Sequence, residues 1–443
     1  MTLFTVSAIL LLDTLAASAS IGVSSITWWV LLGIAFFVPY GLISAELGTT
    51  YPEQGGIYAW VRDSFGARWG TRITWLYWLN NVLWDASVFV LFAGIFAQMF
   101  FPDLSLTAKI GIAIGLTWAM VAITCLSLNI GKWIPNTGAI IKMIAFTALV
   151  IGGVAFALRH EGPLANDFSF SALTPEWDSG IQYISAIIYG MLGFELMSSA
   201  SEEMKNPARD IPRAIAWSGV AIFLFYILGT FAILAVVPLD EIDLVEGLVD
   251  TFRQLFGDSA LGSAAAMTLG IFALFTFLSN TTTWSIGANR AAAQAAIDGE
   301  LPRFLAREHA RYGTPVGAAV TMGLLITVVL LAYGFVGGEN AELFWNLFAA
   351  SAVLFLLPYV GAVLAFWYAR KNDAERPRPY RVPGGNGVAG LITIVCTGIL
   401  LLSIFLFMYV PGEGFSLEVV IGSVTAIVLG EIAIFRAEHE NRQ

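Results

Sequence analysis

Four ionisable residues stand inside long apolar stretches of this 443-residue chain: Asp13, Asp85, Lys142 and Glu195. A charge at the centre of a bilayer costs roughly 3 kcal/mol or more, so such residues ordinarily face a partner or a cavity. A carboxylate there can hold the ammonium group of a ligand or carry a proton, and a buried lysine can lose and regain one. The same groups can instead be fixed charges or hydrogen-bond acceptors that hold the fold together. The residue types alone leave both interpretations open.

Glu195 stands in the stretch 181–203, whose helical pattern is weakened by Gly190 and Gly193 near its middle. A lipid-exposed backbone must satisfy its own hydrogen bonds, so a broken helix survives only where it lines a protein cavity. In transporters such breaks form the substrate site, and their freed amides suit an anionic group. Glu195 could accept a proton or cap the broken helix. The predicted lining residues are Tyr189, Gly190, Phe194 and Glu195.

A second helix break is predicted near the start of the chain, where Asp13 and Thr14 precede the small residues Ala16 to Ser20. We interpret Asp13 as a counter-ion for a substrate ammonium or as a proton carrier, with Thr14 and Ser18 beside it. The alternative is a structural carboxylate that is hydrogen-bonded at the helix break.

One further position could recognise a cationic group. Asp85 follows Trp84, and a tryptophan beside a buried carboxylate suits a cation, although Asp85 could instead bond to Asn80 or Asn81. A polar patch at 280–284 ends at Trp284. The threonines of that patch are expected to bond back to their own helix.

Long apolar segments must position these residues. The chain is 58% hydrophobic and 12% charged, with a mean hydropathy of +0.77, which is typical of a polytopic helical membrane protein and not of a soluble domain or a β-barrel. We predict twelve spans, at 3–22, 26–48, 70–101, 107–128, 134–158, 179–201, 212–238, 259–289, 315–335, 342–369, 388–410 and 416–436.

Charge fixes the expected orientation. With both termini in the cytoplasm, eighteen of the 22 lysines and arginines fall in inner connections, as the positive-inside rule requires. We therefore expect a protein of the cytoplasmic (inner) membrane with a retained first helix, not a cleaved signal peptide. No basic stripe indicates nucleic-acid binding, and the two cysteines form no metal or disulfide pattern.

The two spans with predicted helix breaks, 3–22 and 179–201, lie five helices apart. This is the spacing expected of two inverted five-helix halves with a site at their interface. We therefore predict one transmembrane domain over residues 1–443, with halves at 1–158 and 179–369 and two further helices at 388–436.

Four sequence motifs carry a family resemblance: Ala45 to Val61, Gly193 to Pro212, Trp284 to Arg290, and Arg381 to Gly385. In these the chain resembles the amino acid–polyamine–organocation transporter superfamily, nearest the glutamate/GABA antiporter group and the polyamine carriers. The resemblance implies a leucine-transporter-type fold with broken helices one and six. It also implies that an acidic residue belongs near the first break, where Asp13 stands. Trp284 matches a motif tryptophan of the antiporter group, so the resemblance implies that it is a substrate-binding residue.

The resemblance further bears on Lys142, which follows Asn136 by six residues. In several proton-coupled members a lysine at such a position takes the place of a sodium ion. Lys142 and Glu195 are therefore the expected proton-coupling residues, and a fixed structural charge is the alternative for Lys142.

Together these features predict a secondary active transporter, either an antiporter or a proton-coupled symporter, of amino acids or related amines. A polyamine or diamine carrier is an alternative, as is an amine-permeable channel or sensor from another class. No nucleotide-binding motif, nucleophile–base pair or metal cluster is present in the sequence, so we expect neither an enzyme nor a cofactor. The expected partners are the substrate, the lipid bilayer and possible coupling protons, and the oligomeric state is open.

Overall fold

The computed structural model describes residues 6, 9–51, 56–126, 133–175, 179–196, 206–257, 259–336 and 339–440. Within these ranges the chain is almost wholly helical, with one two-stranded antiparallel ribbon formed by β1 (Tyr409–Val410) and β2 (Gly414–Phe415). The motif residues 52–55 and 197–205 lie outside the described ranges.

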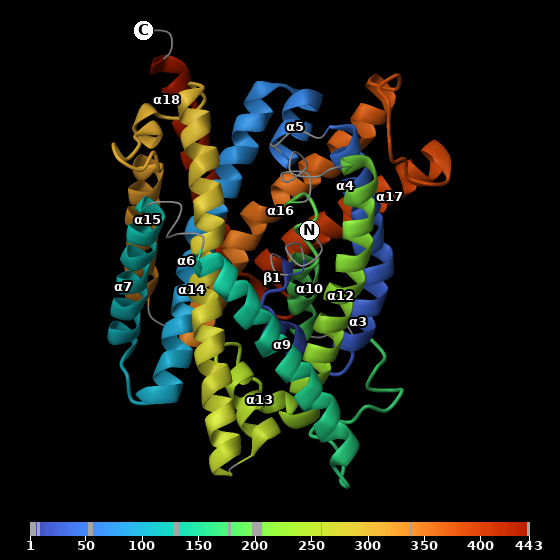
Figure 1. Cartoon of the computed structure of the whole chain (residues 1–443), viewed down its shortest axis with the longest axis vertical. Coiled ribbons are helices and arrows are strands. Elements are labelled where there is room, and N and C mark those ends of the chain that lie inside the picture. The colour runs from blue at the N-terminus through green and yellow to red at the C-terminus, as the bar shows by residue number, and fades with distance from the viewer. Residues whose placement is uncertain are drawn as a thin grey trace.

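Among the residues that the structure describes, ten helical segments are long and apolar enough to cross a bilayer, and they stand together as a bundle (Figure 1). One of them, Ser25–Thr50, consists of α3 (Ser25–Leu32), the π-helical turn Gly33–Phe37 and α4 (Val38–Thr50). The others are α6 (Ala67–Phe100), α7 (Leu106–Cys125), α9 (Trp133–Arg159), α12 (Pro207–Val236), α14 (Ala260–Ile297), α15 (Val316–Val336), α16 (Asn340–Asn372), α17 (Gly385–Met408) and α18 (Leu417–Glu440).

The other two predicted spans appear as short pieces. Of 3–22, residues Leu10 to Thr14 are not helical, and α2 (Leu15–Ala19) follows them. Of 179–201, a 3-10 turn (Ser179–Tyr183) leads into α10 (Ile184–Gly190), after which residues 191–195 leave the helix. The break predicted at Gly190–Glu195 is therefore confirmed. The first break lies at Leu10–Thr14 and not at Asp13–Ser18, because the small residues after Thr14 favour helix.

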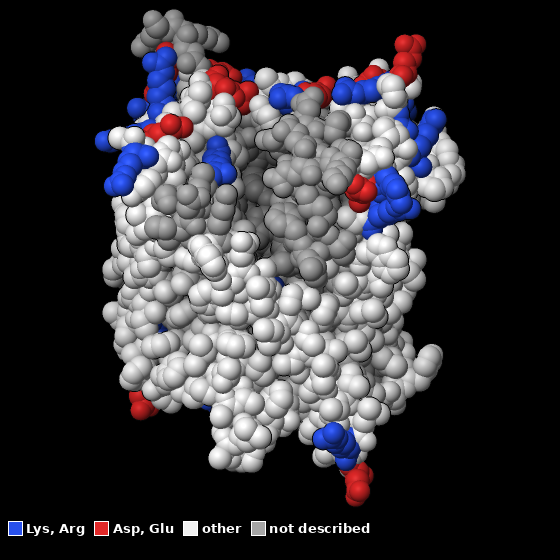
Figure 2. Space-filling view, viewed as in Figure 1, with Lys and Arg blue, Asp and Glu red and all other residues white. Residues whose placement is uncertain are grey.

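The interior is formed chiefly by α6 and α16, which are mostly buried, whereas fewer than a third of the residues in the apolar windows of α7, α9 and α18 are buried. Short helices close the ends of the bundle: α5 (Ile57–Phe65) lies at one end and α13 (Gly247–Phe256) at the other (Figure 1). In a space-filling view, charged side chains gather at the two ends and leave an uncharged band between them (Figure 2). That band is what a membrane-embedded surface requires.

A buried ion-pair cluster ties α4 to the end of α16. The Arg370 guanidinium donates to both carboxylate oxygens of Glu46, at 2.8 and 2.5 Å, and the Val382 amide donates to Glu46 at 2.7 Å. Arg378 lies 3.3 Å from the same carboxylate. Glu46 is therefore an ion-pair partner of two arginines near the end of α4.

Two predicted boundaries need correction. The predicted span 259–289 ends too early: α14 continues through Ile297, because Ala291 to Ala296 comprise five alanines and one glutamine, which favour helix. α12 begins at Pro207, five residues before the predicted limit, and Pro212 lies within its early turns.

Candidate functional site

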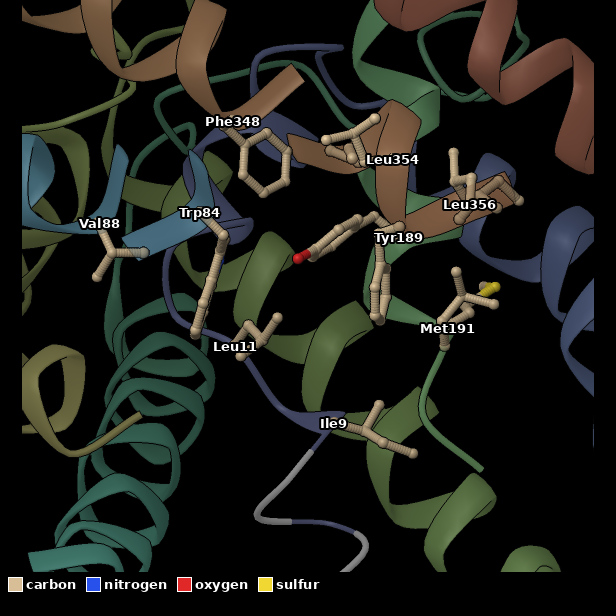
Figure 3. Close-up of a cluster of buried hydrophobic side chains, with 14 of the residues drawn as sticks. Ile9, Leu11, Trp84, Val88, Tyr189, Met191, Phe348, Leu354 and Leu356 are labelled. Atoms are coloured by element: carbon tan, nitrogen blue, oxygen red, sulfur yellow. The ribbon is translucent and has the colours of Figure 1, made fainter. Parts of the chain in front are cut away.

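Both unwound segments border one small closed cavity at the centre of the bundle. Its volume is about 10 Å³, which is room for roughly one water molecule. In Figure 3 the side chains of Leu11, Trp84 and Tyr189 converge from the first unwound segment, α6 and α10. The lining residues are Ile9, Leu11, Asn80, Asn81, Trp84, Tyr189, Leu192, Trp284 and Phe355.

Asp13 is buried beside this cavity, with 3% of its surface exposed. The indole N–H of Trp84 donates to Asp13 Oδ2 at 3.1 Å, whereas Oδ1 has no hydrogen-bond partner among the described residues. Trp84 thus pairs with Asp13 and not with its sequence neighbour Asp85. The Thr14 hydroxyl donates to the Leu11 carbonyl at 3.3 Å, so it stabilises the unwound segment. A structural contact and a free carboxylate oxygen therefore coexist at Asp13.

Asp85 lies on the same face of α6, one turn beyond Asn81. The Ser285 hydroxyl of α14 donates to Asp85 Oδ2 at 2.6 Å. Asp85 Oδ1 has no described partner, and neither do the amide oxygens of Asn80 and Asn81. Asn81 does use its amino group, which donates to the Tyr77 carbonyl at 2.8 Å. Asn80 and Asn81 therefore present hydrogen-bond acceptors to the cavity, whereas Asp85 is buried near them and does not line it.

Lys142 points from α9 into the bundle and is 1% exposed. Its ammonium donates to the side-chain oxygen of Asn280 on α14 at 2.7 Å, and it interacts electrostatically with Asp13. A close helix contact makes this possible: a Cβ at Gly138 would lie 1.8 Å from the Ser279 hydroxyl oxygen. The structure thus brings Lys142 to the first-span break. Asn136 of the predicted motif is exposed on α9.

Glu195 stands at the end of the second break. It accepts hydrogen bonds from the hydroxyls of Tyr359, at 2.6 Å, and Tyr40, at 3.3 Å. Glu195 also lines a separate vestibule of about 650 Å³, which runs past Thr74 and Arg290 toward Asp298 at the end of α14. Glu195 is therefore both held by two phenols and placed next to an open path.

Three aromatic rings from three helices separate this vestibule from the small cavity. Tyr77 of α6 borders the vestibule, while Trp284 of α14 and Phe355 of α16 border the cavity. Their ring centroids are 6.1, 5.9 and 6.1 Å apart pairwise. We call these three residues the aromatic triad. Because the three rings contact one another at similar distances, the triad forms one aromatic layer between the vestibule and the small cavity.

Of the nine predicted substrate-binding residues, only Tyr189 and Trp284 line the cavity. Asp13 and Asp85 are buried beside lining residues, Thr14 lies in the first unwound segment, and Glu195 lines the vestibule. The other three, Phe194, Ser18 and Gly190, pack elsewhere. Phe194 stacks on Phe37, with ring centroids 4.8 Å apart, and so packs toward α4. Ser18 donates to the Leu15 carbonyl at 2.8 Å and lies 3.1 Å from the Thr230 hydroxyl. A Cβ at Gly190 would meet the Tyr226 ring at 3.2 Å. Thr281, Thr282 and Thr283 bond to carbonyls of their own helix, as expected.

Sequence reasoning did not find Tyr226 of α12. Its hydroxyl donates to the Ile9 carbonyl at 3.0 Å and accepts from the Leu11 amide at 2.9 Å. The ring is fully buried and packs against Gly190 of the second break. Tyr226 therefore supports both unwound segments. A tyrosine within an apolar span is the only signal in the sequence, and it does not distinguish this role from ordinary packing.

Comparison with known proteins identifies the family. The family model described as amino acid permease matches residues 1–430. This chain belongs to the amino acid permease family. It is 34% identical, over 96% of its length and 91% of the relative's, to a probable agmatine/putrescine antiporter of Lactococcus lactis. It is 26% identical to the polyamine transporter PUT1 of Oryza sativa, over 92% of this chain and 71% of the relative.

A third relative is the glutamate/gamma-aminobutyrate antiporter of Lactococcus lactis, 24% identical over 86% of this chain and 76% of the relative. The predicted superfamily is thereby confirmed, and so is the predicted function class, secondary transport of amino acids or amines. The family and these relatives are transporters and not enzymes. Many apolar helices and this family make the chain an integral membrane protein.

Proposed function

We propose that this permease exchanges or accumulates a substrate with a cationic amine end, and binds that end among Asp13, Asp85, Asn80 and Asn81. The observation that carries the proposal is a set of unpartnered acceptors at and beside the small cavity: Asn80 and Asn81 line it, and Asp13 and Asp85 are buried next to the lining residue Trp84, by its indole hydrogen bond and by sequence respectively. Each of these four side chains has a buried oxygen without a described partner. An unpaired buried acceptor costs roughly 1–3 kcal/mol, so a ligand rich in N–H donors would gain from filling these positions.

The aromatic residues add to this chemistry. Trp84 and Trp284 border the cavity with their rings 6.3 Å apart and nearly perpendicular. A cation over an indole face gains roughly 0.5–2 kcal/mol, more when it is desolvated. Tyr189 completes the lining opposite Trp84, and Phe194 and Ser18 serve indirectly, by packing the two breaks. An ammonium group between the indoles and the carboxylates would satisfy both kinds of contact.

The proposed cycle is alternating access. The vestibule reaches Glu195 and Tyr77 from one end of the bundle, while the cavity beyond is too small for even a short diamine. Entry therefore requires the aromatic triad to separate. Each of its rings lies on a different helix, so a small tilt of α6, α14 or α16 would open the passage. This conformation is then an inward-directed state with a closed binding site.

The proposed topology has twelve spans in one domain, residues 1–443, with both termini in the cytoplasm. Inverted five-helix halves at 1–158 and 179–369 precede two helices at 388–436. Gly193 supports the interface between the halves: its φ is +124°, and a Cβ there would lie 2.7 Å from Ile9. The two breaks thus approach each other directly, as a site between two repeats requires.

Proton coupling is proposed for Lys142 and Glu195. Lys142 bridges α9 to Asn280 and acts electrostatically on Asp13, so its charge state would alter the first break. Glu195 lines the vestibule, so a proton that enters the bundle from that side would reach Glu195 before it reached the small cavity. A site that changes its charge as it opens would link substrate binding to proton release.

A binding screen tests the substrate proposal. Purified protein would be heated with agmatine, putrescine, lysine, arginine, glutamate or gamma-aminobutyrate, since a ligand of the folded state raises apparent stability. We expect the cationic amines to raise the melting temperature most, and Asp13→Asn to remove that shift. Agmatine and putrescine are the first choices, because a relative 34% identical to this chain is a probable agmatine/putrescine antiporter. A shift with glutamate but none with any cationic amine would contradict the proposal.

A further inference from the structure

A second large recess lies on the outside of the bundle, away from the transport path. Its volume is about 1020 Å³, at the upper end of ordinary ligand pockets, which are roughly 300–1,000 Å³. One wall is the face of α9 from Ala139 to Phe156, and the other is Leu255 and Phe256 at the end of α13. α9 crosses the front of the bundle obliquely and passes α13 near its far end (Figure 1).

The lining of this recess is apolar along nearly its whole length. Ile140, Ile144 and Ile151 are 64%, 47% and 62% exposed, so this face of α9 meets whatever surrounds the bundle. From Ala139 to Phe156 the helix rises roughly 26 Å, most of the ~30 Å hydrocarbon thickness of a bilayer. In a membrane, the acyl chains of lipids would occupy such a recess.

The end of the recess differs chemically from the rest. Arg159 and His160 line it there, at the last residue of α9 and just beyond it. Arg159 is exposed and forms no ion pair with any described residue, whereas Arg253 on α13 pairs with Asp250 at 3.5 Å. The His160 ring stacks on Phe156, with centroids 4.8 Å apart, and so continues the apolar wall up to the charge.

We propose that this recess, here named the α9 groove, binds an anionic phospholipid. The acyl chains lie along Ile140 to Phe156, and the headgroup phosphate pairs with Arg159. The charge complementarity selects an anionic over a zwitterionic lipid, because a basic residue near a membrane surface attracts anionic lipid by about 1 kcal/mol. The opposite face of the same turns of α9 carries Lys142, so a lipid in the α9 groove would steady the helix that positions this lysine.

Native mass spectrometry of the detergent-purified full chain tests the proposal, with phosphatidylglycerol and phosphatidylcholine of equal chain length as probes. We expect phosphatidylglycerol to bind more tightly. Arg159→Gln should weaken its binding about fivefold, which corresponds to about 1 kcal/mol. Arg159→Lys should retain the preference, and the control Arg253→Gln should behave as the wild type.

A second variant separates the groove from the charge. Thr147 is exposed and lines the middle of the recess, so Thr147→Trp should fill it without disturbing the core and should weaken binding of both lipids. Equal affinity of the wild type for the two lipids, or unchanged binding by Arg159→Gln, would overturn the proposal. So would disulfide-linked dimers formed efficiently by Ile151→Cys in liposomes, because a second copy would then occupy the groove.

Discussion

Removing one hydroxyl group should loosen both unwound segments at once. Tyr226→Phe keeps the ring, which stacks on Trp29 with centroids 4.6 Å apart, and deletes only the oxygen. The Ile9 carbonyl and the Leu11 amide then lose the partner that lies 3.0 and 2.9 Å away. Each buried unpaired backbone group costs roughly 1–3 kcal/mol. We expect a total destabilisation of roughly 2–4 kcal/mol, because a water molecule can recover part of the loss.

The assay compares thermal unfolding and substrate affinity of the purified variant with those of the wild type. Tyr183→Phe is the matched control, since the hydroxyl of Tyr183 makes no hydrogen bond to a described residue while its ring packs on Trp345. We expect Tyr226→Phe to unfold at a clearly lower temperature and to bind substrate more weakly, and Tyr183→Phe to change neither. If Tyr226→Phe matched the wild type in both measurements, the hydroxyl would not support the first break, and our reasoning would be refuted.

Three further predictions concern charged residues. Lys142→Ala should abolish uptake driven by a pH gradient in proteoliposomes, while substrate binding is largely kept. Full pH-driven uptake by this variant would exclude the coupling role, and loss of folded protein would favour a structural role. Asp13→Asn and Asp85→Asn should each weaken amine binding in isothermal titration more than they lower folded yield, and wild-type binding by Asp85→Asn would confine recognition to the first break. Glu46→Gln should destabilise the protein by about 3–5 kcal/mol in thermal unfolding, since it leaves buried Arg370 unpaired; an unchanged melting temperature would show that the ion pair contributes little.

One prediction concerns the aromatic triad. Phe355→Ala should open a permanent path between the vestibule and the cavity, and so raise substrate efflux from loaded proteoliposomes when no exchange substrate is outside. Phe405→Ala is a control on the bundle surface, where the ring packs on Tyr409 at 5.0 Å. Unchanged efflux with Phe355→Ala would show that the passage is closed elsewhere.

Hydropathy and the positions of helix-breaking residues were sufficient to place most of the helices, because both are local properties of the sequence. The predicted limits 134–158 and 315–335 lie within one residue of α9 and α15. The Gly190–Glu195 break was predictable because Gly193 adopts a φ that favours glycine. The first break was misplaced by a few residues, since the alanines after Thr14 resume the helix and the sequence pattern did not separate unwinding from small side chains.

Contacts between distant helices could not be predicted. The sequence gives no sign that Trp84 bonds to Asp13 and Ser285 to Asp85, because each pairing depends on how three helices rotate about their axes. Phe194 lies within the second helix break, where an aromatic ring can turn either toward the cavity or toward α4. The amide that receives Lys142 is Asn280, 138 residues later in the chain, and not Asn136, which one turn and a half of α9 places on an exposed face.

Substrate exchange measured directly tests the central claim, that a cationic amine crosses the bilayer through the cavity at Asp13. Proteoliposomes loaded with unlabelled putrescine or agmatine, or with buffer alone, would be given the labelled amine outside. We predict uptake several-fold faster into loaded than into empty vesicles, and loss of that stimulation with Asp13→Asn at unchanged folded yield. Equal uptake into loaded and empty vesicles, or full stimulation with Asp13→Asn, would contradict the account.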